Sequence, residues 1–169
     1  MGGARPLAPW RWLGVPLVQC LVLTVLFSLP FRAFGLSLPE PIFPMVPAFA
    51  WAVIRPSILA PVGVLIMGLF LDVFWGAPLG LWALSLLITY GAALVGRNMM
   101  AGQSWPVMWS WYAVTSGLAM GAAFLFTMLD SHATASLVAV AWQFLVTLLL
   151  FPFAHLLIDR FEDADVRFR

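Results

Sequence analysis

Six apolar runs follow one another along this chain, separated by short breaks that carry most of its polar residues. They cover residues 13–29, 42–54, 57–75, 78–96, 105–129 and 133–158. A helix needs about 20 consecutive apolar residues to cross the hydrocarbon core of a bilayer. Only 9% of the residues are charged, against about 25% in soluble domains. We therefore predict an all-α polytopic membrane protein, with about six transmembrane helices in one domain (13–158) between short tails (1–12 and 159–169).

The positive charges predict the orientation. All eight are arginines, since the chain has no lysine, and cytoplasmic loops accumulate positive charge. With six spans and the N-terminus inside, every arginine except Arg32 faces the cytoplasm. A five-span arrangement with the N-terminus outside leaves two arginines outside. The first arrangement is favoured, and it places both tails in the cytoplasm.

The second run is the weak point of the six-span prediction. It has 13 residues, with Pro44 and Pro47 near its start and Pro39 and Pro41 just before it. As a helix it covers about 20 Å of a core about 30 Å thick. We expect this segment to be tilted, broken or re-entrant.

A lone carboxylate lies between two apolar runs, in the stretch GLFLDVFWGAPLG (68–80). An ionised Asp inside a bilayer costs roughly 2.5 to 3.5 kcal/mol, so Asp72 is a candidate functional residue. Gly68, Asp72 and Gly76 are four residues apart and share one face if the helix continues through them. The carboxylate then needs an arginine, backbone donors of the fourth helix or a polar group of a partner protein, and Arg32 is the expected arginine.

An ordinary structural role explains the same junction about equally well. Asp72 then marks the outer interface, Gly76 opens a turn before Gly80, and Pro78 is the first residue of the fourth helix, where proline is favoured.

Small residues recur at every fourth position of the fifth run. Ala113, Gly117 and Gly121 form a stripe that allows two helix backbones to approach closely. Packing within the fold is favoured over a dimer or partner face, because such stripes are common in polytopic proteins.

Catalytic and metal-binding patterns do not emerge from the sequence. Cys20 is the only cysteine, and the two histidines, His132 and His155, are far apart. Ser, Thr and Gln residues are scattered over the runs, where they usually hydrogen-bond to a helix backbone. We expect no enzyme activity, no cofactor, no metal and no nucleic-acid partner.

The order of these features resembles the rod shape-determining protein MreD family. The resemblance is carried by PEPIFPMVPAFAWAVIRP (39–56), by G-x-x-x-D-x-x-x-G-x-P-L-G (68–80) and by SLLITYGAALVGR (85–97). The last run ends in LLLFPFAHLLIDRF (148–161), where that family also tends to carry a proline and aromatic residues before a short polar tail. The resemblance covers most of the chain, with its most specific part between residues 39 and 97.

This resemblance implies a non-catalytic protein of the bacterial inner membrane that helps maintain rod shape. Its implied partners are MreC, MreB, the RodA glycosyltransferase with its class B penicillin-binding transpeptidase, and membrane lipid. The implied fold resembles the membrane substrate-binding subunits of energy-coupling-factor transporters. A small-molecule-binding subunit of a transporter is the alternative, because interrupted helices often line binding sites. An intramembrane enzyme is the least favoured reading.

Overall fold

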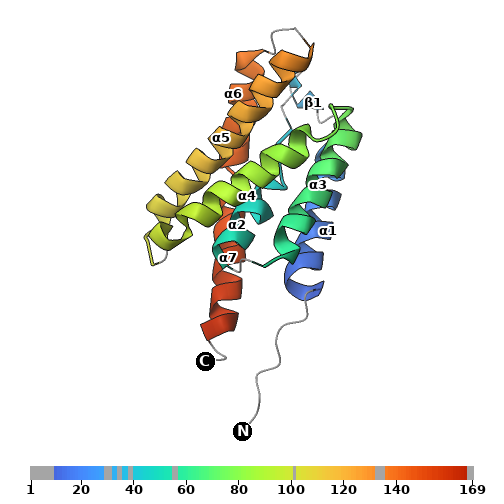
Figure 1. Cartoon of the computed structure of the whole chain (residues 1–169). Helices are drawn as coiled ribbons and strands as arrows, with labels where there is room; N and C mark the ends of the chain where they lie inside the picture. The colour runs from blue at the N-terminus through green and yellow to red at the C-terminus, as the bar shows by residue number, and fades with distance from the viewer. Residues whose placement is uncertain are drawn as a thin grey trace.

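The computed structural model describes residues 10–28, 32–33, 36–37, 40–54, 57–100, 102–131 and 136–166. Its helices are η1, a short π-helical turn (Trp10–Gly14), α1 (Val15–Phe27), α2 (Met45–Ile54), α3 (Leu59–Trp75), α4 (Leu81–Met100), α5 (Trp105–Ser131), α6 (Leu137–Leu148) and α7 (Phe151–Val166). Two strands of two residues each, β1 (Arg32–Ala33) and β2 (Leu36–Ser37), pair antiparallel. Apart from this small ladder the described chain is helical, as the apolar runs predict (Figure 1).

The helices alternate in direction through the bundle. In Figure 1, α1, α3 and α5 run upward, whereas α2, α4, α6 and α7 run downward. The start of α1 and the end of α7 therefore lie at the same end of the bundle. This arrangement is consistent with six crossings, of which α6 and α7 together make the last.

The short helix α2 lies at the centre of the bundle, with α3, α4 and α7 packed around it. All its residues from Met45 to Val53 are buried. Its sequence, MVPAFAWAVI, is apolar on every side, which is the pattern of a helix surrounded by protein. The indole Nε1 of Trp51 donates a hydrogen bond to the carbonyl of Trp12 in η1, at 3.2 Å.

The second apolar run extends from one end of the bundle to the other. Near its start, Glu40 accepts a hydrogen bond from Trp75, the last residue of α3. Near its end, the carbonyl of Val53 accepts one from Arg97, in the last turn of α4. Since α3 and α4 are antiparallel, these two contacts lie at opposite ends. Residues 40–42 are non-helical, residues 43 and 44 form a turn, and α2 begins only at Met45. Of the three expected shapes, the structure has the broken one.

The sixth apolar run is also interrupted, although a single helix was expected over 133–158. The structure has two helices, α6 and α7, with a turn at Leu149 and Leu150 between them. Pro152 explains the break, because its nitrogen cannot donate to the carbonyl of Leu148 and its ring would clash with that turn. The second helix, α7, continues to Val166, into the stretch expected to be a polar tail.

The closest helix contacts occur at two glycines. A Cβ added to Gly68 on α3 would lie 2.2 Å from the Cα of Ala83 on α4. A Cβ added to Gly96 on α4 would lie 2.6 Å from the ring of Trp111 on α5. These glycines set the distances between α3, α4 and α5, because any side chain would separate the helices.

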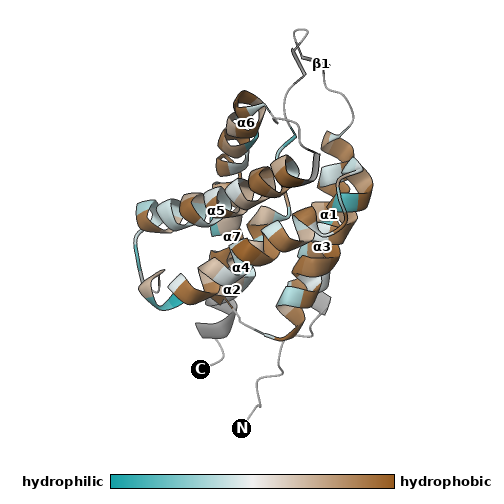
Figure 2. Ribbon diagram, turned by 45° about the horizontal axis from the view of Figure 1, so that its top comes forward, coloured by the Kyte–Doolittle hydropathy of each residue, from teal (hydrophilic) through white to brown (hydrophobic). Residues whose placement is uncertain are grey.

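The outer surface of the described bundle is largely apolar. Large hydrophobic side chains are exposed on every described helix from α1 to α7 except α2. Figure 2 shows hydrophobic residues along α3, α4, α5 and α6. Two helical stretches, Trp105–Leu129 and Leu137–Ile158, are long and apolar enough to cross a membrane. The second of them includes the turn between α6 and α7. An apolar surface of this extent is typical of a chain covered by lipid or by other proteins.

Candidate functional site

Asp72 joins the end of α3 to the start of α4. Its side chain is fully buried. One carboxylate oxygen, Oδ2, accepts a hydrogen bond from the backbone N–H of Gly80 at 2.8 Å, and Oδ1 accepts one from Trp82 at 2.7 Å. The first backbone N–H groups of a helix have no partner within that helix. Asp72 therefore caps α4 from the preceding helix.

This cap explains why an anion is present at the junction. The residue just before α4 is Gly80, which has no side chain oxygen with which to cap its own helix. A carboxylate at this position also interacts favourably with the positive end of the α4 dipole. The sequence predicts an arginine, backbone donors of the fourth helix or a partner protein as the partner of Asp72. The structure shows the backbone donors at the start of α4. For Arg32 the described part is the backbone, so the expected pairing with its side chain lies outside the described residues.

Two glycines shape the turn between α3 and α4. Gly76 has φ of +63° and ends α3, with its N–H bonded to the carbonyl of Asp72. Gly80 has φ of +99°. Side chains are disfavoured at such positive φ values. Because Gly76 ends the helix, Gly68, Asp72 and Gly76 do not continue along one helix face.

Pro78 differs from its expected place. The sequence places it at the first position of the fourth helix, but α4 begins at Leu81. Pro78 lies in the preceding turn, where its carbonyl accepts a hydrogen bond from the N–H of Leu81 at 3.1 Å. The positive φ of Gly80 interrupts helical geometry between them.

Aromatic and acidic side chains extend the junction toward the second run. The indole Nε1 of Trp75 donates to Oε2 of Glu40 at 2.8 Å. Trp75 also contacts Trp82 edge to face, with ring centroids 5.1 Å apart. Through these contacts the segment just before the second run is attached to the junction between α3 and α4 that Asp72 caps.

The backbone donors from residue 41 to residue 48 are satisfied. The N–H of Ile42 donates to the hydroxyl of Thr147 on α6 at 3.2 Å. The next donors form short-range turns to nearby carbonyls: Phe43 to Pro41, Met45 to Ile42, Val46 to Phe43 and Ala48 to Pro44. The remaining positions are Pro41, Pro44 and Pro47, which have no N–H. Other residues at these three positions would each bring a backbone N–H that needs a partner outside a regular helix. The prolines avoid that need.

Neighbouring helices supply partners for the carbonyls of this segment. The amide Nε2 of Gln143 on α6 donates to the carbonyl of Glu40 at 3.2 Å. The thiol of Cys20 on α1 lies 3.8 Å from the carbonyl of Phe43. Buried backbone groups outside helices need hydrogen-bond partners from the protein or from water. Here α1 and α6 provide these partners.

Sequence reasoning treated Gln143 and Thr147 as ordinary scattered polar residues. They are in fact the groups of α6 that bind the interrupted segment, and the hydroxyl of Thr147 also donates to the carbonyl of Gln143 at 2.7 Å. Their spacing of four residues places them on one helix face. That spacing, together with a proline-rich segment needing partners, is the signal that could have identified them.

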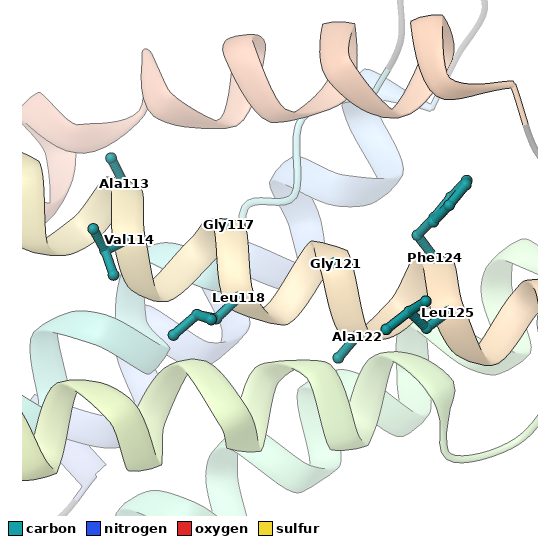
Figure 3. A pocket seen from close by; sticks show the side chains of 8 residues that line it. All are labelled: Ala113, Val114, Gly117, Leu118, Gly121, Ala122, Phe124 and Leu125. Carbon is teal, nitrogen blue, oxygen red and sulfur yellow. The ribbon is translucent and has the colours of Figure 1, made fainter.

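The small-residue stripe of α5 lies on an open groove. Eight residues of α5 line a space of about 620 Å³, among them Ala113, Gly117 and Gly121, as Figure 3 shows. A Cβ on Gly117 would lie 3.5 Å from the ring of Phe144 on α6, whereas one on Gly121 would have nothing within 4 Å. The stripe is therefore not a continuous close helix contact, and the expected packing role is not met at Gly121.

No group of three or more potential metal ligands occurs within the part of the chain that the structure describes. His155 lies in α7, with its ring 6.1 Å from that of Phe151. His132 is outside the described residues.

Three comparisons of the chain, with models of protein families, with curated proteins and with solved structures, find no match. The functional proposal below therefore stands on the residues and contacts of this chain.

Proposed function

We propose that this chain is a multi-pass protein of the bacterial inner membrane, of the MreD type. It acts as a non-catalytic scaffold of the cell-elongation machinery. Its partners are MreC, MreB, and the RodA glycosyltransferase with its class B penicillin-binding transpeptidase.

The observation that carries this proposal is the geometry of the 68–80 junction. Four residues of the pattern that carries the resemblance have a physical role there. Gly68 permits the closest contact between α3 and α4, Asp72 caps α4, and Gly76 and Gly80 adopt positive φ values. Residues that matched the pattern only by chance would not need to have such structural roles. The geometry therefore supports the family assignment.

Two further features support a membrane scaffold. The helices α1 and α3 to α7 expose large apolar side chains, as expected where lipid and partner helices replace water. The buried polar side chains Asp72 and Thr147 are bonded to backbone groups of other segments. They hold helices in place, which is the role of polar groups in a scaffold.

The alternative function is a small-molecule-binding membrane subunit of a transporter. It is favoured by the interrupted second run, since broken helices often line such sites. However, polar groups near the break already bond to the protein: Gln143 donates to the carbonyl of Glu40, and Thr147 accepts from the N–H of Ile42. This pairing favours the scaffold.

Co-purification from native membranes tests the proposal. The chain is tagged at its C-terminus and extracted in mild detergent, and another multi-pass protein with the same tag is the control. We expect MreC to be enriched with the tagged chain relative to the control. Enrichment of a transporter ATPase would favour the alternative, and enrichment of neither class would overturn the scaffold proposal.

Reporter fusions test the membrane orientation. A reporter that is active only in the periplasm, fused after Ser37, should be active. The same reporter after Arg169 should be silent, because both tails are expected in the cytoplasm. Activity after Arg169 would overturn the orientation.

A further inference from the structure

The turn from α2 to α3 lies at the end of the bundle where α1 begins and α7 ends (Figure 1). Arg97, in the last turn of α4, reaches this turn and donates through Nε to the carbonyl of Val53 at 3.1 Å. A guanidinium carries several further N–H donors. Those of Arg97 make no hydrogen bond or ion pair within the described residues. Arg97 therefore brings unused donors and a positive charge to this place.

Tyr90, on the same helix, is a buried side chain whose hydroxyl proton lacks an acceptor. Only 6% of the residue is exposed. Its hydroxyl lies beside the backbone of Ser57 and within electrostatic reach of Arg97. In the part of the chain that the structure describes, this O–H donates to no acceptor, whereas the hydroxyl of Tyr112 donates to a carbonyl. Leaving a buried donor unpaired is unfavourable, so an acceptor from outside the chain is expected here.

The start of α3 adds backbone donors beside the Tyr90 hydroxyl. Ser57 accepts from the N–H of Ala60 at 3.3 Å. The N–H groups of Ile58 and Leu59 donate to no carbonyl among the described residues, and Ile58 has no side-chain group that could cap the helix. Free N–H groups and the helix dipole make such a terminus attractive to anions. Because Ile58 is 88% exposed, these donors are accessible from outside the bundle.

The surroundings of this turn favour an anion with several oxygens. The two acidic side chains that the structure describes, Glu40 and Asp72, lie at the other end of α3. A guanidinium binds phosphate oxygens well, because its planar set of donors matches their geometry. Donors from Tyr90, Arg97 and the backbone together suit a phosphate group, which offers more acceptors than a carboxylate.

We propose that Tyr90, Arg97 and the first turn of α3 bind the phosphate group of an anionic phospholipid. The exposed apolar side chains of Val62 and Ile66 follow Ile58 along one face of α3, and they provide a surface for the acyl chains. Basic pockets on the cytoplasmic side of membrane proteins bind anionic headgroups in this way. Inorganic phosphate has the same acceptors but no acyl chains. The inference rests on the membrane placement in the proposed function and does not involve MreC.

Native mass spectrometry of the full-length protein in detergent tests the site. Equal amounts of phosphatidylglycerol and phosphatidylcholine are added, and we expect the unaltered protein to retain mainly phosphatidylglycerol. Arg97→Gln should lower the retained phosphatidylglycerol by about fivefold, and Tyr90→Phe by about threefold. Arg32→Gln is the charge-matched control, because β1 lies at the opposite end of the bundle (Figure 1). It should retain the lipid as the unaltered protein does.

Inorganic phosphate is the third ligand in this experiment. It should not displace phosphatidylglycerol, because the acyl chains add contacts that phosphate lacks. Displacement by inorganic phosphate, with no preference between the two lipids, would overturn the lipid as the occupant. Equal retention of phosphatidylglycerol by the unaltered protein, Arg97→Gln and Tyr90→Phe would overturn the site itself.

Thermal unfolding separates a binding role of Tyr90 from a structural one. Tyr90→Phe removes an O–H without an acceptor and leaves the bond from Arg97 to Val53 in place, so the midpoint without lipid should not change. The rise in midpoint that bound phosphatidylglycerol produces should fall by about half or more. Tyr112→Phe removes an O–H that is bonded to Thr147, so it should lower the midpoint and keep the full rise.

A lower midpoint in Tyr90→Phe, together with an undiminished rise on adding phosphatidylglycerol, would make Tyr90 a structural residue and overturn its role in the site. These measurements use the purified protein without partners. The lipid site can therefore fail while MreC still co-purifies with the chain, and the scaffold proposal can fail while the lipid is retained.

Discussion

The Oδ1 atom of Asp72, on α3, lies 2.7 Å from the backbone nitrogen of Trp82, in the first turn of α4. One turn earlier on α3, Gly68 meets the backbone of Ala83. A polar cap and a close backbone contact thus lie side by side between the same two helices. The two contacts determine different features: the cap sets where α4 begins, and the glycine sets the distance between the axes of α3 and α4.

The cap predicts that Asp72 tolerates Asn poorly. Both carboxylate oxygens accept from an N–H group, whereas Asn offers one acceptor and turns an NH2 group toward the other donor. An unpaired buried donor costs about 1 to 3 kcal/mol. We expect Asp72→Asn to lower the midpoint of thermal unfolding in detergent by several degrees, and Asp72→Ala to lower it further.

Ser85→Ala is the matched control for this series, because the hydroxyl of Ser85 bonds only to the carbonyl of Leu81 in its own helix. It should change the midpoint by a degree or so. If Asp72→Asn unfolds like the unaltered protein but no longer retains MreC, the carboxylate acts on a partner and the capping role is secondary.

A second prediction concerns the contact at Gly68. The nearest atoms to an added Cβ are the Cα and backbone nitrogen of Ala83, at 2.2 and 2.6 Å, and backbone cannot move aside as a side chain can. Overpacking typically costs about 1 to 3 kcal/mol. Gly68→Ala should therefore lower both the yield of folded protein and its unfolding midpoint.

Gly91 on α4 provides the control, since a Cβ there has no neighbour within 4 Å. Gly91→Ala should be neutral or stabilising by up to about 1 kcal/mol, from helix propensity. Combining Gly68→Ala with Ala83→Gly should not restore stability, because the obstructing atoms belong to the backbone. Full rescue by Ala83→Gly would contradict this account.

The sequence predicts some of these features and misses others for physical reasons. The apolar runs predict most of the helices, because they are longer than ordinary strands. The spacing of Gly68 and Asp72 predicts a shared face. However, run length alone could not show that residues 40–42 are non-helical, because the N–H of Ile42 is bonded to Thr147, which is 105 positions away in the chain. The α5 stripe also could not show that Gly121 has open space beside it, since spacing shows which residues are small but not whether a neighbour is present.

A third prediction concerns the prolines before α2. Pro44 and Pro47 keep the segment from winding into a continuous helix, which over residues 40–54 would cover only about 22 Å. Residues 40–42 lie outside the helix in the structure, so winding them into a helix would move Glu40 away from Trp75. We expect Pro44→Ala alone to be mild, because Pro47 still lacks the N–H that a continuous helix would need. The double change to Ala should lower the unfolding midpoint and impair assembly.

Fluorescence of Trp75 reports the outcome, since its indole bonds to Glu40. The double variant should shift the emission of this residue, measured as the difference from matched proteins with Trp75→Phe. Unchanged emission and unchanged stability would mean that the prolines are incidental to the shape of the segment.

The last prediction separates two glycines of the same stripe. At Gly117 an added Cβ lies 3.5 Å from the ring of Phe144, so the longer side chain in Gly117→Leu must displace that ring and with it α6. At Gly121 the space is open. We expect Gly117→Leu to lower the unfolding midpoint by several degrees and Gly121→Leu to leave it unchanged, measured by loss of the monodisperse peak after heating. If Gly121→Leu remains stable but no longer co-purifies with MreC, the open part of the stripe is a partner surface; if both variants retain full stability and MreC, this face of α5 contacts only lipid.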